Sequence, residues 1–129
     1  MPTDTHILIS LGSNHLPNAH IRWASGCLAT LFEDVRFSDI IWTQDVKGSG
    51  HWYMNRLAAC TTQLTVEEIE QKLKAIEQKA HRTKEHVTID LDLMQYGTGR
   101  FHDRDWSRPY ILRLLPLGCF EEPAFGKNC

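Results

Sequence analysis

Apolar and polar residues alternate along most of residues 88–94, which read Thr-Ile-Asp-Leu-Asp-Leu-Met. This period of two predicts a half-buried β-strand. Side chains alternate between the two faces of a strand, so Asp90 and Asp92 are expected to share one face. Ile89 and Leu91 would then be buried on the other face. The pattern therefore predicts a strand that carries two acidic residues whose Cα atoms lie about 7 Å apart.

The same kind of pattern predicts three more strands and two helices. Apolar runs predict strands over residues 7–11, 36–43 and 53–64. Apolar residues three and four apart predict one helix after Pro17 and another after Thr65, which opens a capping box. The two apolar helix stripes are Ile21, Ala24, Leu28 and Leu31, and Val66, Ile69, Leu73 and Ile76.

The predicted order of elements is β-α-β-β-α-β, the split βαβ or ferredoxin-like arrangement. We therefore expect an α+β fold with a four-stranded, mostly antiparallel sheet and helices on one face. The other face would remain available for ligands. Residues 1–129 are expected to form one domain, because this length is typical of a single core. After residues 96–99 the sequence becomes polar and irregular, and a last apolar segment covers residues 110–117.

Composition and charge narrow the class of protein. With 42% hydrophobic residues, 23% charged residues and a formal charge of −2, the chain is typical of a soluble globular protein. The near-neutral balance does not favour a nucleic acid or a membrane surface as partner. No apolar run is long enough for a membrane span, and the four cysteines show no paired spacing, so a cytoplasmic protein with reduced thiols is expected. The sequence does not predict an oligomeric state.

Asp90 and Asp92 form the strongest candidate for chemistry. Two carboxylates on one strand face repel each other unless a cation lies over them, and hard oxygen ligands suit Mg²⁺. The preceding segment contributes Arg82, Lys84 and His86, which could hold phosphate oxygens. Two simpler interpretations stay open: a polar strand face turned to solvent, and a basic helix end favoured by the helix dipole.

Five short segments together resemble a known family. They are Leu11-Gly12-Ser13-Asn14, Tyr53-Met54-Asn55, Ile76-Glu77, Ile89-Asp90-Leu91-Asp92-Leu93 and Leu114-Leu115-Pro116-Leu117. In this order they resemble 6-hydroxymethyl-7,8-dihydropterin pyrophosphokinase of folate biosynthesis. The resemblance implies an enzyme that transfers pyrophosphate from ATP to the hydroxymethyl group of the dihydropterin, with two Mg²⁺ ions. It implies that the chain binds two small molecules, a pterin and ATP.

The resemblance also implies a role for particular residues. Asp90 and Asp92 match the aspartates that bind the two Mg²⁺ ions, and together with Arg82 they would be the catalytic residues. The positions that match pterin contacts are Thr43, Val46, Tyr53 and Asn55. The positions expected at the nucleotide are Glu77, Arg82, Lys84 and His86. An aromatic wall with an amide suits a flat heterocycle rich in donors and acceptors, and Tyr110 is the nearest candidate for a second aromatic wall.

The chain departs from the family in several places. Gln44 follows Thr43 where the family has a Thr-x-Pro-like start to its second loop, and Lys84 stands in place of a second arginine. His86 and Val87 replace a Pro-Arg pair before the aspartate strand. These differences fall mainly on the ATP side. They leave two alternatives open: a divergent relative that binds a pterin or nucleotide without turnover, and an interaction module that uses the open sheet face.

Overall fold

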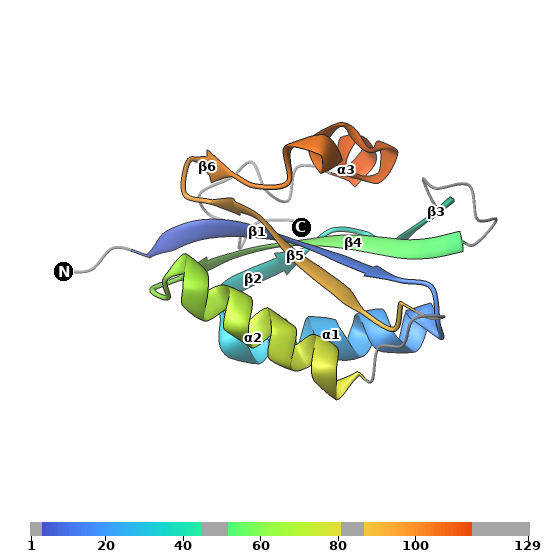
Figure 1. Ribbon diagram of the computed structural model, residues 1–129, viewed down its shortest axis with the longest axis horizontal. Helices are drawn as coiled ribbons and strands as arrows, with labels where there is room; N and C mark the ends of the chain where they lie inside the picture. The colour runs from blue at the N-terminus through green and yellow to red at the C-terminus, as the bar shows by residue number, and fades with distance from the viewer. Residues whose placement is uncertain (1–3, 45–51, 81–86, 115–129) are drawn as a thin grey trace.

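The structure, a computed structural model, describes residues 4–44, 52–80 and 87–114. Its elements are β1 (Thr5–Ser13), α1 (Pro17–Leu31), β2 (Glu33–Phe37), β3 (Ile41–Gln44), β4 (Trp52–Thr62), α2 (Val66–Lys79), β5 (Asp90–Tyr96), β6 (Gly99–Arg100), a 3-10 helix (Asp103–Ser107) and α3 (Pro109–Leu114). The described strands form one antiparallel sheet in the order β2-β4-β1-β5-β6, and β3 also pairs with β4 (Figure 1). The fold is therefore α+β.

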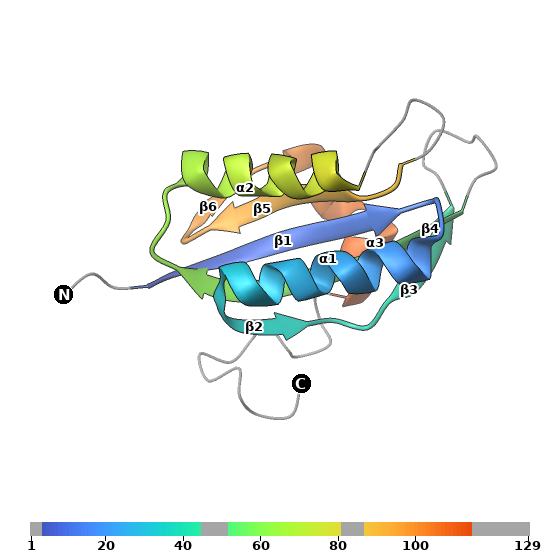
Figure 2. The same ribbon diagram turned by 90° about the horizontal axis from the view of Figure 1, so that it is seen from below.

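The helices α1 and α2 lie side by side against one face of this sheet (Figure 2). The predicted apolar stripes are confirmed in large part, since the buried residues are Ile21, Ala24 and Leu28 on α1, and Ile69, Leu73 and Ile76 on α2. They pack against alternate residues of the neighbouring strands β1 and β5, including Ile9 and Leu11 of β1 and Leu91 and Leu93 of β5. This layer is the main core of the protein.

The predicted burial of the aspartate strand is confirmed. Ile89 and Leu91 are 0% and 5% exposed and belong to the core beneath the helices. The strand itself begins at Asp90, and Thr88 is buried in a bend just before it. The alternation therefore places the apolar residues correctly, although the first residues of the pattern lie outside the strand.

The prediction of a four-stranded sheet is wrong, because the sheet has six strands in the described chain. Residues 36–43 do not form one strand. They divide into the end of β2 and most of β3, and both strands pair with β4. Between them, the Leu57 N–H donates to the side-chain Oγ of Ser38 at 2.8 Å, and the Ser38 N–H donates to the Leu57 carbonyl. A side-chain acceptor has replaced a backbone acceptor, so the regular ladder stops there.

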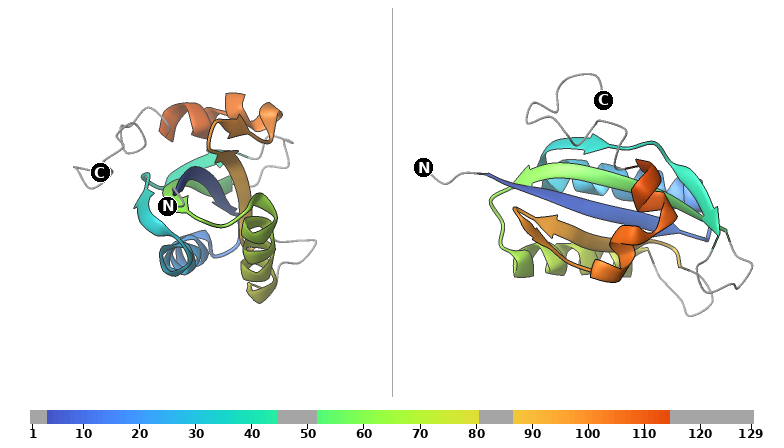
Figure 3. Two further views of the ribbon diagram at one scale, coloured as in Figure 1. Left: turned by 90° about the vertical axis from the view of Figure 1, so that its left-hand side faces the viewer. Right: turned by 90° about the horizontal axis from the view of Figure 1, so that it is seen from above.

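The prediction that helices occupy only one face is also incomplete. Figure 3 shows α3 on the face opposite α1 and α2. Ile111 and Leu114 of α3 are fully buried in a second, smaller core with Leu57 and Met94. The chain reaches this face through a tight turn at Gly97, whose φ of 59° favours glycine, followed by the short strand β6. Part of the face expected to be open is therefore covered.

No helix in the described ranges is long and apolar enough to cross a membrane.

Cys60 is expected to resist alkylation in the folded protein. Its side chain is fully buried in the main core, and this burial raises the pKa of the thiol to about 12. At pH 8 only roughly one thiol in ten thousand would be the reactive thiolate. Peptide mass spectrometry after iodoacetamide treatment should find Cys27, which is half-buried, modified well before Cys60. Denaturant should make both react, and rapid modification of native Cys60 would contradict the described packing.

Candidate active site

The two aspartates lie where β5 is an edge of the sheet. On one side β5 pairs with β1, with Ser10 opposite Asp92 and Gly12 opposite Asp90. On its other side β6 pairs only with Gln95 and Tyr96, further along the strand. Because Leu91 belongs to the helix-side core, the half-buried side chains of Asp90 and Asp92 share the opposite face. The prediction that the two carboxylates share one face is confirmed.

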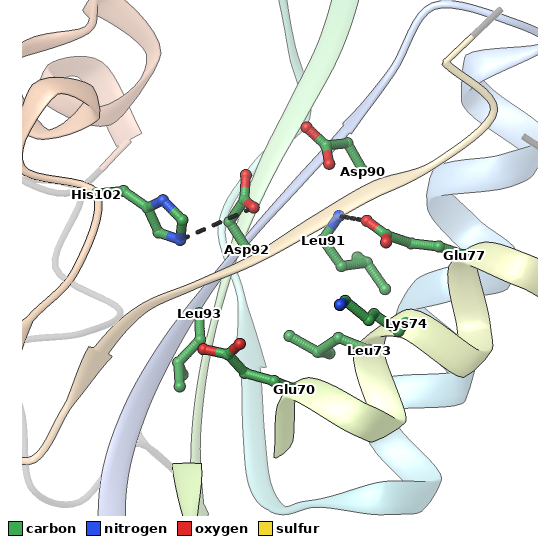
Figure 4. Close-up of a pocket in the computed structure, with 9 residues that line it drawn as sticks. All are labelled: Glu70, Leu73, Lys74, Glu77, Asp90, Leu91, Asp92, Leu93 and His102. Carbon is green, nitrogen blue, oxygen red and sulfur yellow. Dashed lines mark hydrogen bonds and ion pairs between the residues drawn. The ribbon is translucent and has the colours of Figure 1, made fainter. Parts of the chain in front are cut away.

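A pocket follows this open edge of β5 (Figure 4). It has a volume of about 190 Å³ and is lined by Glu70, Leu73, Lys74, Glu77, Asp90, Leu91, Asp92, Leu93 and His102. Four carboxylates and one ammonium group, with His102 neutral, give this lining a formal charge of −3. Such a pocket favours cations over free anions. Its volume is below the range of about 300–1,000 Å³ that encloses drug-sized ligands, so it could enclose only part of a ligand of that size.

Helix α2 brings its charged residues to the pocket by regular spacing. The capping box formed by Thr65 and Glu68 fixes the start of the helix, and the buried side of α2 contacts β5. Glu70, Lys74 and Glu77 follow at intervals of four and three residues, which places them on one side of the helix. Glu77 reaches the strand itself, because its Oε2 accepts a hydrogen bond of 2.8 Å from the Leu91 N–H.

His102 is a member of this site that the sequence interpretation missed. Its Nε2 lies 3.9 Å from an Asp92 carboxylate oxygen, and both side chains are partly exposed. The hairpin explains this proximity, because β6 runs back along β5 with Arg100 opposite Gln95. Two residues further on, the chain returns to the level of residue 93. His102 also has a left-handed backbone, with φ of 56°, which is uncommon outside glycine and is enriched at functional sites.

The candidate pterin residues gather on the same sheet face as the aspartates. Tyr53 and Asn55 alternate with helix-side residues along β4, and β3 places Thr43 opposite Tyr53. The Asn55 amide donates to the Thr43 hydroxyl at 2.5 Å, and Asn55 is only 6% exposed. Gly12 is the cross-strand partner of Asn55 as well as of Asp90. The pterin candidates and the metal candidates are therefore joined by one row of residues across three strands.

Gly12 has little room for a side chain. A Cβ atom at this position would lie 3.2 Å from the Asn55 Oδ1. The absence of a side chain lets the Asn55 amide lie close to β1. This close approach is a physical reason for a glycine at the end of the first strand.

Tyr110 approaches this face from α3. Its hydroxyl is hydrogen-bonded to the Ser10 Oγ at 3.0 Å, and Ser10 is the cross-strand partner of Asp92. Burial raises the pKa of the Tyr110 phenol above its ordinary value, and the nearby charges of Asp105 and Asp92 act in the same direction. The phenol therefore stays neutral well above pH 7. Tyr110 therefore lies on the sheet face that also carries Asp92 and Asn55. Along β4, Tyr53 precedes Asn55, whereas Tyr110 packs against the cluster of Leu57, which follows Asn55.

The turn after β1 is tied to the segment that leads into β5. The Asn14 side-chain oxygen accepts from the Val87 N–H at 2.8 Å, and the Asn14 N–H donates to the Val87 carbonyl at 2.9 Å. Asn14 therefore does not cap α1, whose N-cap residue is Leu16. Asn14, in the bend that follows β1, has a structural role here, since it fixes the entry of the aspartate strand.

The remaining candidates, Val46, Arg82, Lys84 and His86, lie outside the described residues. The structure thus brings together Thr43, Tyr53, Asn55, Asp90 and Asp92 on one face, with Glu77 at the adjoining edge.

The donor set of the described site suits Mg²⁺ bound together with phosphate. Within the described ranges no group of three or more His, Cys, Asp or Glu side chains could hold a metal ion. Mg²⁺ usually takes only one or two protein carboxylates and completes its shell with water and substrate phosphates. Asp90 and Asp92, partly exposed at an open edge, offer such a pair of hard ligands. A closed protein cage for zinc or calcium would need more ligands.

Comparison with known proteins gives one family. Residues 8–120, most of the chain, match the family model of 7,8-dihydro-6-hydroxymethylpterin-pyrophosphokinase, abbreviated HPPK. No curated protein matches the chain significantly. Apart from the first three residues of β1, the matched range contains the described strands and helices that form the candidate site.

Proposed function

Because the chain belongs to the 7,8-dihydro-6-hydroxymethylpterin-pyrophosphokinase family, we propose that it transfers pyrophosphate from ATP to 6-hydroxymethyl-7,8-dihydropterin. The observation that carries this proposal is the position of Asp90 and Asp92. They lie together at the edge of β5, on the sheet face that also carries Asn55. Two half-buried carboxylates in a pocket of charge −3 would repel ATP unless divalent cations were bound with it. The proposed reaction is therefore magnesium-dependent.

In the proposed reaction the pterin hydroxyl oxygen bonds to the β-phosphorus of ATP. The bond from that phosphorus to the bridging oxygen of the α-phosphate breaks, its electrons stay on the departing AMP, and the hydroxyl proton is released to solvent. Asp90 and Asp92 would hold two Mg²⁺ ions, which neutralise phosphate charge as it develops. The chain contributes mainly by positioning its two substrates in line, which can account for a large part of such an acceleration.

On the pterin side, Tyr53 would offer an aromatic surface while the Asn55 amide and the Thr43 hydroxyl orient the heterocycle. The Asn55–Thr43 hydrogen bond supports this assignment because it fixes the amide before any ligand arrives. Val46 is proposed as a further pterin contact.

On the nucleotide side, the residues proposed from the family are Glu77, Arg82, Lys84 and His86. Arg82 and Lys84 would place permanent positive charge against the triphosphate, because guanidinium and ammonium groups bind phosphate oxygens well. Of these four residues, Glu77 is the one within the described part of the chain, and it lines the pocket beside Asp90. This supports placing the nucleotide along the edge of β5.

The proposal is tested by following AMP formation with ATP, Mg²⁺ and the hydroxymethyl-dihydropterin, and by calorimetry with a non-hydrolysable ATP analogue. We expect AMP in a one-to-one ratio with pterin diphosphate, only when Mg²⁺ and both substrates are present. Pterin or nucleotide binding without AMP would support a non-catalytic relative and overturn the enzyme proposal. The absence of binding to either ligand would favour an interaction module.

A further inference from the structure

The bond between Glu77 and Leu91 joins helix α2 to the aspartate strand at one chemically important point. Glu77 Oε2 accepts from the Leu91 N–H at 2.8 Å, and Leu91 is the residue between Asp90 and Asp92 (Figure 4). The Leu91 side chain is buried in the main core, so its backbone cannot move without disturbing that packing. The bond therefore joins a helix and a strand that are both anchored in the main core.

The location of β5 in the sheet gives this bond its importance. An edge strand has backbone N–H groups that point away from the sheet and need another partner. Along β5, the short strand β6 supplies such pairing only at Gln95 and Tyr96. At Leu91 the partner is the carboxylate of Glu77. Hydrogen bonds to an ionised acceptor are shorter and stronger than neutral ones, so the carboxylate serves in place of a neighbouring strand.

We infer that Glu77 is a positioning residue, which holds the backbone between Asp90 and Asp92 so that both carboxylates face the site together. This inference rests on the proposed function for its metal, but the hydrogen bond it starts from does not. It assigns Glu77 an indirect part at the nucleotide site, through Leu91. In metal sites, residues that orient the ligands in this way typically affect metal affinity or activity by about 10–100-fold when they are removed.

The first test measures the bond in the free protein. Hydrogen exchange of the Leu91 amide should be faster by about tenfold or more in Glu77→Ala, because the amide loses its acceptor. Glu77→Gln should keep the protection, since its side-chain carbonyl oxygen can still accept. Glu70→Ala is the matched control: Glu70 lines the same pocket from the same helix, and no hydrogen bond joins it to β5 among the described residues. It should leave Leu91 exchange unchanged.

The second test measures the metal requirement. The Mg²⁺ concentration for half-maximal turnover should rise about 10–100-fold in Glu77→Ala and return to within a few-fold of the parent in Glu77→Gln. A role of Glu77 through its charge would give the opposite result, because glutamine and alanine would then be equally deficient. Rescue by glutamine therefore separates a hydrogen-bonding role from an electrostatic one.

The outcomes distinguish this inference from the proposed function. Absence of turnover in the parent protein would remove the proposed function, while Leu91 exchange would still decide whether Glu77 holds the strand. Unchanged Leu91 exchange in Glu77→Ala, or a glutamine variant as impaired as the alanine variant, would overturn the inference. If Glu77→Ala does not fold, Glu77→Gln decides alone: parent-like exchange and Mg²⁺ requirement support the inference, and loss of either overturns it.

Discussion

Replacing Asp92 with Asn is expected to lower Mg²⁺-dependent turnover by about 100-fold or more while the fold stays intact. Asparagine keeps the shape of the side chain but removes the charge, so a metal ion loses an anionic ligand. A metal that neutralises phosphate charge contributes several kcal/mol to the transition state, which accounts for the expected size of the loss. AMP formation measures the activity, and thermal unfolding with and without Mg²⁺ measures the fold and the metal binding.

Stability should change little in the same variant. The substitution removes repulsion between Asp90 and Asp92 and also removes the pairing with His102, which is 3.9 Å away and partly exposed. Exposed charge pairs of this kind contribute at most about 1 kcal/mol in either direction. Asp103→Asn, in the exposed 3-10 helix outside the pocket, is the matched control and should behave like the parent. A lower melting temperature for Asp92→Asn, together with no effect of Mg²⁺ on the parent, would identify the aspartates as structural.

Replacing Asn55 with Ala is expected to weaken pterin binding by roughly 5- to 150-fold and to leave nucleotide binding nearly unchanged. Asn55 is buried, and its amide is already fixed by the Thr43 hydroxyl. Removing one partner from a buried polar contact costs about 1–3 kcal/mol, which gives the expected range. Calorimetric titrations with the hydroxymethylpterin and, separately, with Mg²⁺ and an ATP analogue measure the two affinities.

Asn18→Ala gives a matched control for that experiment. Asn18 is exposed on α1 and accepts a hydrogen bond from Arg22, away from the candidate site. Its replacement should leave pterin affinity within twofold of the parent protein. Equal losses of pterin and nucleotide affinity in Asn55→Ala would indicate a general disturbance of the sheet, and unchanged pterin affinity would remove Asn55 from the site.

The spacing of apolar residues predicted which side of each helix and strand is buried. The alternation around Leu91 and the helical spacing through Leu73 report which side of each element is apolar, and both residues are buried as expected. The break at Ser38 was not predicted, because it depends on a hydrogen bond to Leu57 from a distant strand. Only two polar residues, Ser38 and Asp39, separate Phe37 from the apolar run at residues 40–42, so the sequence of residues 36–43 resembles a single strand.

The candidate site was predictable to a similar degree. Asp90 and Asp92 are found from alternation alone, whereas the approach of His102 requires the hairpin register. The Tyr-Gly-Thr-Gly turn contained that signal, because a reversal there brings a residue ten positions later back beside Asp92. The contact of Glu77 with the β5 backbone depends on how α2 packs, and no local pattern reports it.

The row formed by Asn55, Gly12 and Asp90 fixes the spacing between the pterin candidates and the metal candidates. Neighbouring strands lie about 4.8 Å apart, so two such steps set the outer two residues about 10 Å apart. This interval is fixed by the backbone hydrogen bonds of the sheet and not by side-chain rotamers. In the proposed reaction, the pterin and the metal-bound phosphates would then be held at a separation that the sheet sets, whichever side chains surround them.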